Sequence, residues 1–231
     1  MAEFKFIGFE KTDITATITL RRDDLNHFNI TMLGEITAAL WDISNSRGIK
    51  LLVFKAEGIA FCGGFDYDSL PREDFEKLIY THHKTILLLE KIKCPTICLL
   101  QGAALGAGFE LAIACDFVLA VEGAKVGFPE IKKGHLPTVA MAMASYVGHL
   151  KHINELIMTG DTITVEEAKI FGMINHVYPR DDFRTRCEEF VYRLTSNPGE
   201  ALYHAKKLIR DSRNISFEQV LERIDGNYPK A

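Results

Sequence analysis

Residues 99–116 limit what this chain can fold into more than any other segment. They read as an apolar strand, a turn of mostly glycine and alanine at 101–108, and a helix that carries Glu110 in its first turn. Small residues let a ligand approach the backbone closely, and the free N–H groups at a helix start favour negative charge. A turn of this kind can build an oxyanion hole with a carboxylate beside it.

Length and charge narrow the class of protein. The 231 residues suit one large domain or a domain with a small appendage, and the net charge of −4 argues against nucleic acid or an anionic membrane as the main partner. The charged residues 1–10 do not resemble a signal peptide, and no apolar run is long enough to cross a bilayer. We therefore expect a soluble cytoplasmic protein.

The five cysteines are an odd number and have apolar neighbours, which indicates reduced and mostly buried thiols. Cys94 and Cys98 lack a second pair of cysteines or histidines that could complete a zinc site. We predict no metal site.

Hydrophobic periodicity predicts an α/β fold, because strands and helices alternate before a helical tail. Strands are expected at residues 14–20, 51–54, 96–100, 117–120 and 174–177, and helices at 33–43, 75–92, 140–146, 153–158, 165–171, 183–194, 201–210 and 217–224.

Two further segments could carry chemistry. In FCGGFD, at residues 61–66, paired glycines after a buried strand allow a sharp turn that exposes the backbone N–H near Phe65, although a plain glycine turn reads the same way. In residues 126–134, Pro129 precedes Glu130 among apolar neighbours. A carboxyl held in a dry pocket has a raised pKa, as a general acid needs; a solvated surface acid is the alternative for both Glu130 and Glu110.

In this order and spacing, the three segments resemble the enoyl-CoA hydratase/isomerase (crotonase) superfamily over nearly the whole chain. Further matches are at residues 16–20, 95–96, 156–160, 167–168 and 172–175. The resemblance implies a spiral of ββα units over residues 1–180 and a shortened C-terminal helical subdomain, residues 181–231, that contacts other subunits. It also implies a coenzyme A thioester as substrate, no separate cofactor, and a homotrimer or hexamer.

Carried over by position, the oxyanion-hole donors are the backbone N–H groups of Phe65 and Ala107, and the catalytic acids are Glu110 and Glu130. Phe65 stands where alanine is commoner, so its ring should narrow the acyl pocket. The other residues expected to contact the acyl-CoA are Asn26, Gly64, Asp66, Tyr67, Asp68 and His135.

Two acids favour addition of water to, or its removal from, an α,β-unsaturated acyl-CoA, because one glutamate activates water while the other gives a proton to C2. An enoyl-CoA isomerase, a dehydratase or decarboxylase of carrier-protein thioesters, and a non-catalytic acyl-CoA-binding protein remain alternatives. Residues 135–143, 24–26 and 30–32 look more like hydratases of cyclic dienoyl-CoA than like other hydratases of the family.

Two pairs of basic residues have less specific readings. His82 and His83 lie on an expected helix, where a solvated or partly packed pair is favoured over a pair of ligands. Lys206 and Lys207 are expected on a solvated helix face, with contact to the phosphates of coenzyme A as the alternative.

Overall fold

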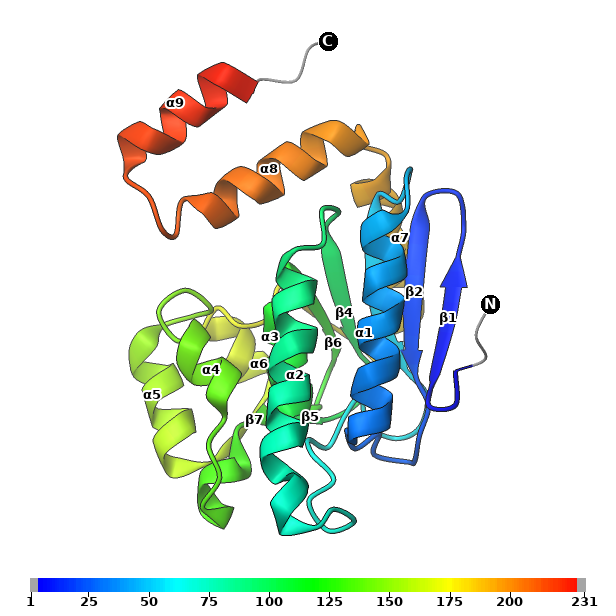
Figure 1. The fold of residues 1–231 in the computed structure, drawn as a ribbon, viewed down its shortest axis with the longest axis vertical. Helices are drawn as coiled ribbons and strands as arrows, with labels where there is room; N and C mark the ends of the chain where they lie inside the picture. The colour runs from blue at the N-terminus through cyan, green and yellow to red at the C-terminus, as the bar shows by residue number, and fades with distance from the viewer. Residues whose placement is uncertain (1–3, 228–231) are drawn as a thin grey trace.

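A six-stranded sheet forms the centre of the molecule in the computed structural model, which describes residues 4–227 (Figure 1). The strand order is β1-β2-β3-β4-β6-β9, and every neighbouring pair is parallel except the hairpin β1–β2. Its strands are β1 (Ile7–Lys11), β2 (Thr15–Leu20), β3 (Leu51–Ala56), β4 (Thr96–Leu100), β6 (Phe117–Val121) and β9 (His176–Tyr178).

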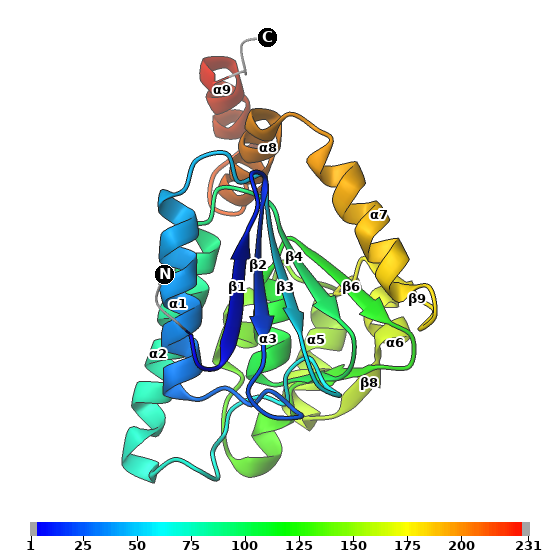
Figure 2. The same cartoon turned by 90° about the vertical axis from the view of Figure 1, so that its right-hand side faces the viewer.

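Helices cover both faces of this sheet, as Figure 2 shows. Helices α1 (Ile30–Asn45) and α2 (Phe75–Glu90) lie on one side, and α7 (Phe183–Thr195) lies on the other. Leu51 and Val53 of β3 pack with Cys187 and Phe190 of α7, whereas the alternate residues of β3 belong to the main core. A parallel strand buried on both faces is apolar at successive positions, which is how residues 51–54 read.

A second, three-stranded sheet gives the chain its spiral. It contains β5 (Ala104–Leu105), β7 (Lys125–Gly127) and β8 (Thr162–Thr164), in that order. After β4 the chain runs through β5 into α3 (Ala107–Ala114), and after β6 it runs through β7 to the short helices η2 (Pro129–Lys133) and α4 (Thr138–Met143). The mixed α/β fold with ββα turns is confirmed.

The remaining helices complete the described chain. They are η1 (Arg72–Asp74), α5 (Leu150–Thr159), α6 (Val165–Ile170), α8 (Gly199–Asp211) and α9 (Phe217–Asn227). Helices α8 and α9 lie beyond the ends of the strands, at the top of Figures 1 and 2. The expected boundary at residue 180 separates α7 from the sheet that it covers. Residues 1–3 and 228–231, at the ends of the two expected units, lie outside the described residues.

The expected helices and strands agree with the structure, with small shifts at their ends. The first helix begins at Ile30 rather than at Leu33, because the Asn29 side chain caps it by accepting the N–H of Met32. The hairpin strand β1 and the short strands β5, β7 and β8 were not predicted. All five cysteines are free and buried.

Candidate active site

The FCGGFD loop and the turn before α3 lie against each other. Cys62 pairs with Ala104, and the Cys62 carbonyl accepts the N–H of Leu105 at 2.9 Å. Gly64 has a φ of +101°, and a Cβ at this residue would lie 3.2 Å from the Leu105 carbonyl and 3.9 Å from the Ala107 nitrogen. A residue with a side chain would be strained here, so glycine allows the two loops to meet. The peptides of Phe65 and Ala107 thus belong to adjacent backbone segments.

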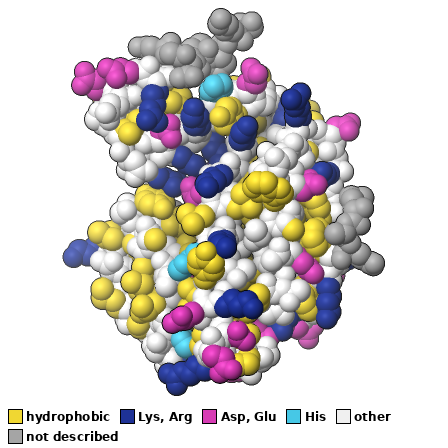
Figure 3. Space-filling model, viewed as in Figure 1, with side chains coloured by type: hydrophobic (Ala, Val, Ile, Leu, Met, Phe, Trp, Pro, Cys, Tyr) yellow, Lys and Arg dark blue, Asp and Glu magenta, His cyan; other side chains and the backbone are white. Residues whose placement is uncertain are grey.

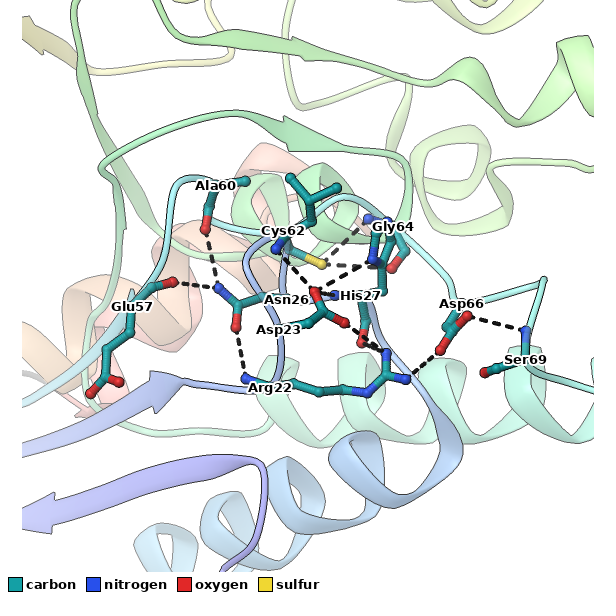
Figure 4. A network of polar contacts seen from close by, with 11 residues as sticks. Arg22, Asp23, Asn26, His27, Glu57, Ala60, Cys62, Gly64, Asp66 and Ser69 are labelled. Carbon is teal, nitrogen blue, oxygen red and sulfur yellow. Dashed lines mark hydrogen bonds and ion pairs between the residues drawn. The ribbon is translucent and has the colours of Figure 1, made fainter.

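A polar network fixes the loop that supports Phe65 (Figure 4). Asn26, fully buried with a φ of +51°, accepts the N–H of Arg22 and donates its amide to the carbonyls of Glu57 and Ala60. The Arg22 guanidinium pairs with Asp66 and also donates to a loop carbonyl. Burial raises the pKa of Asp66, but bonds to Ser69 and Arg22 outweigh it and lower the pKa overall. Asn26 and Asp66 therefore fix the shape of this loop, and their contact with an acyl-CoA stays a prediction.

Glu110 lies inside the protein, in the first turn of α3, and is 1% exposed. Its Oε1 accepts the N–H groups of Val139 at 2.8 Å and Ala140 at 2.9 Å, both in the first turn of α4. Burial raises the pKa of Glu110 to about 8; the charge of Glu130 adds to this rise, and the two N–H groups oppose it. Glu110 can therefore keep its proton near neutral pH. The alternative interpretation of Glu110, as a solvated surface acid, is wrong.

Glu130 is also buried, 7% exposed, and lies beside the start of α3. A Cβ at Gly106 would stand 2.1 Å from its Oε1, so the carboxyl occupies the space that glycine leaves. Burial raises the pKa of Glu130 to about 7, opposed by its own backbone N–H and by that of Ala107. Its Oε2 has no hydrogen-bond partner within residues 4–227, and no lysine or arginine there pairs with either glutamate.

Aromatic rings gather beside the two acids. Tyr67 stacks on His135 with ring centres 4.2 Å apart, and Phe65 and Phe75 lie 5.6 Å and 5.1 Å from Tyr67. The Tyr67 hydroxyl is buried without a partner among the described side chains, and burial together with Glu130 and Glu110 raises its pKa. The structure therefore brings Tyr67 and His135 to the acids, whereas Asp68 is exposed.

His82 was not placed in this site by the sequence analysis. His82 is fully buried, and its Nδ1 lies 3.5 Å from Glu110 Oε2, so the expectation of a solvated or partly packed pair is wrong for His82. Its neighbour His83 is half-buried and bonds Thr138 Oγ1 at 2.7 Å. A signal was present, because His82 lies four residues from both Leu78 and Ile86 on the buried face of α2.

The expectation for Lys206 is wrong. Its side chain lies neither on a solvated helix face nor where a phosphate of coenzyme A could reach it. Its ammonium is buried, pairs with Asp116 at 2.7 Å and donates to the Cys94 carbonyl. Burial lowers its pKa, and Asp116 opposes that effect. Lys207 is exposed, as expected. Lys206 also lines a cavity of about 350 Å³ beneath α8, where Figure 3 shows a hollow with lysine and arginine side chains.

The sequence of residues 10–225 matches the enoyl-CoA hydratase/isomerase family. The chain belongs to this family. It is 30% identical to a probable enoyl-CoA hydratase of Mycobacterium bovis, over 94% of this chain and 84% of that protein. An enoyl-CoA isomerase/hydratase of Mycosarcoma maydis is 31% identical over 75% of this chain, a match that spans 65% of the fungal protein.

A crystal structure of an enoyl-CoA hydratase from Bacillus anthracis superposes with a TM-score of 0.88 at 26% identity, covering 94% of this chain and 87% of that one. Within residues 4–227 no helix is long and apolar enough to cross a membrane. The same part of the chain contains no group of three or more histidine, cysteine, aspartate or glutamate side chains that could hold a metal ion.

Proposed function

We propose that this protein adds water to an α,β-unsaturated acyl thioester of coenzyme A, or removes water in the reverse direction. The observation that carries the proposal is a pair of buried glutamates beside the Ala107 amide, Glu110 and Glu130, which pair with no lysine or arginine of residues 4–227. A buried carboxyl with no cationic partner takes up and releases protons near neutral pH, as proton transfer to and from carbon requires.

Each part of the site has a role in this reaction. The N–H groups of Phe65 and Ala107 hold the thioester oxygen as it becomes an enolate, and substrate binding transfers the Ala107 N–H from Glu130 to that oxygen. One glutamate, ionised, takes a proton from the water that attacks C3. The other, protonated, gives a proton to C2. Burial raises the pKa of Glu110 to about 8 and that of Glu130 to about 7, so near neutral pH one acid can be protonated while the other is ionised.

The aromatic side chains suggest which acyl group enters. Phe65, Tyr67 and His135 present flat rings beside the acids, and the Tyr67 hydroxyl has no hydrogen-bond partner within the described part of the chain. We therefore propose a compact, planar acyl group, such as crotonyl or a cyclic dienoyl, in preference to a long alkyl chain. The proposal includes no cofactor besides the coenzyme A of the substrate, and it retains a homotrimer or hexamer as the assembly.

The test offers short, cyclic and long enoyl-CoA thioesters, and crotonyl on an acyl-carrier protein, and follows the products by mass spectrometry with and without a metal chelator. We expect a gain of one water on the short or cyclic CoA thioesters, unaffected by the chelator, and loss of that activity in Glu130→Gln. A product of unchanged mass with a moved double bond would instead identify an isomerase. Turnover of none of these substrates by the folded wild-type protein would contradict the proposal.

A further inference from the structure

The consecutive histidines His82 and His83 of α2 reach Glu110 by two different routes. His82 faces the carboxyl directly, with Nδ1 3.5 Å from Oε2. His83 bonds Thr138, the residue immediately before Val139 and Ala140, whose N–H groups hold Oε1. Helix α2 therefore acts on both oxygens of the Glu110 carboxyl. His82 faces Oε2 directly, and His83 acts on Oε1 through the start of α4.

The nitrogens of His82 need an explanation, because buried polar atoms almost always form hydrogen bonds. Both are buried, and neither has a hydrogen-bond partner within the described residues. The Phe65 ring stands edge-on to the imidazole at 5.1 Å and provides no conventional partner. Burial lowers the pKa of His82 to about 3, with a smaller effect of His83, so the ring is neutral and has one N–H and one acceptor nitrogen.

A neutral imidazole suits a carboxyl that changes its protonation state. With its proton on Nδ1, the ring can donate to an ionised Oε2; with its proton on Nε2, Nδ1 can accept from a protonated Oε2, so the two arrangements use different tautomers. The present 3.5 Å separation needs to shorten by only a few tenths of an ångström, as often happens when a substrate tightens an active site. Neither arrangement places a net charge on His82.

We propose that His82 and His83 are positioning residues for Glu110, His82 through contact with Oε2 and His83 through Thr138 and the amides of α4. The inference rests on the proposed function, in which Glu110 exchanges a proton with water or substrate. Without these contacts the carboxyl would keep its burial but lose its fixed direction.

The kinetic test compares His82→Phe, which keeps an aromatic ring and removes both nitrogens, with His82→Asn, whose amide stands near the place of Nδ1. In metalloenzymes, residues that orient a metal ligand by a hydrogen bond contribute roughly 10–100-fold to activity. By analogy, we expect a loss of similar size in kcat for His82→Phe, with KM little changed. His82→Asn should recover most of it. In the Glu110→Gln background, His82→Phe should cause no further loss.

The route through His83 has its own matched pair. Thr138→Val removes the hydroxyl that His83 bonds. The control, Thr85→Val, removes a buried hydroxyl of α2 that bonds Thr37 instead. We expect Thr138→Val to lower kcat several-fold per folded molecule and Thr85→Val to leave it unchanged. An equal effect of the two valines would overturn this route, and unchanged kcat in His82→Phe would overturn the direct one.

A measurement without substrate separates the inference from the proposed function. The infrared carboxyl band of Glu110, assigned by its loss in Glu110→Gln, should shift in His82→Phe and return in His82→Asn. An unshifted band would contradict positioning even if the protein hydrates its substrate. A shifted band in a protein that turns over no thioester would support the contact between His82 and Glu110 and would contradict the proposed function. Should His82→Phe fail to fold, His82→Asn and Thr138→Val carry the test.

Discussion

Glu110 lies in the first turn of α3 and Asp116 lies two residues beyond its end, yet the two acids are surrounded very differently. Asp116 accepts the backbone N–H and the hydroxyl of Thr96 and pairs with Lys206 and Arg210 at 2.7 Å and 3.1 Å. Glu110 accepts two backbone amides and faces a neutral histidine, with Glu130 as its charged neighbour and no lysine or arginine of residues 4–227 paired with it.

The difference teaches how one short segment serves two purposes. Cations within hydrogen-bond distance hold a carboxylate in a structural ion pair, as at Asp116. A dry environment without cations leaves the carboxyl able to hold a proton at neutral pH, as at Glu110 and Glu130. The ion pair joins α8 to the sheet, and the acids without cations form the candidate catalytic centre.

The largest expected effect is on activity in Glu110→Gln. The amide keeps the size of the side chain but cannot exchange a proton, so kcat for hydration of an enoyl-CoA should fall by about 10²–10⁴-fold. Stability at neutral pH should rise, because the carboxyl is ionised in the unfolded chain there and the amide removes that advantage of the unfolded state. Steady-state kinetics and thermal unfolding measure both effects, and nearly normal turnover would rule out Glu110 as a catalytic acid.

Gly106→Ala tests the position of Glu130. The new Cβ would overlap the carboxyl, and the φ of +51° disfavours alanine, so the acid must move. A displacement near 1 Å lowers catalytic rates by about 10²-fold, the loss expected here in kcat. Gly123→Ala is a useful control, because its φ of +73° is also positive and its Cβ would contact nothing. Comparable losses of activity in both variants would show that the effect is backbone strain alone.

Lys206→Met tests the other side of the comparison. It removes one cation from Asp116 and the donor of the Cys94 carbonyl, and should lower the free energy of unfolding by about 1–3 kcal/mol. Turnover per folded molecule should be unchanged, because the ion pair does not contact the acids. Lys207→Met, one residue further on an exposed position, should alter neither quantity. Denaturant titrations and kinetics on the same samples would show whether Lys206 instead contributes to turnover.

The last comparison concerns the dependence of stability on pH. Folding raises the pKa of Glu110 and Glu130 from 4.5 to about 8 and about 7, so the folded protein binds more protons than the unfolded chain in that range. The stabilising contribution is complete below about pH 4.5 and is lost as pH rises through the two raised pKa values. The double glutamine variant should therefore lose less stability between about pH 5 and pH 8 than the wild type. Parallel curves for the two proteins would argue against raised pKa values.

Sequence motifs located the candidate centre because its main groups lie in short local patterns. Glu110 and Ala107 belong to one strand–turn–helix segment, Glu130 follows a proline, and Phe65 follows a glycine pair. The long strands and helices could likewise be predicted from their periodicity. The strands β5, β7 and β8 have two or three residues each, which is too short for any period to show.

Contacts between distant residues could not be predicted in this way. His82 meets a carboxyl 28 residues away, and Lys206 pairs with an acid 90 residues away. Such pairs depend on how α2 and α8 pack onto the rest of the chain. The burial that raises the pKa of Glu110 is equally a property of the whole fold, so the sequence indicated the acid but could not decide between a dry and a solvated one.

The most direct test of the account is a titration of the two glutamates by NMR of isotope-labelled carboxyl carbons, with each signal assigned by its loss in Glu110→Gln or Glu130→Gln. The account predicts that the two groups lose their protons near neutral pH, at apparent pKa values of about 8 and about 7. Ionisation of both groups near their ordinary value of 4.5 would contradict it, because neither could then hold a proton for C2 at neutral pH.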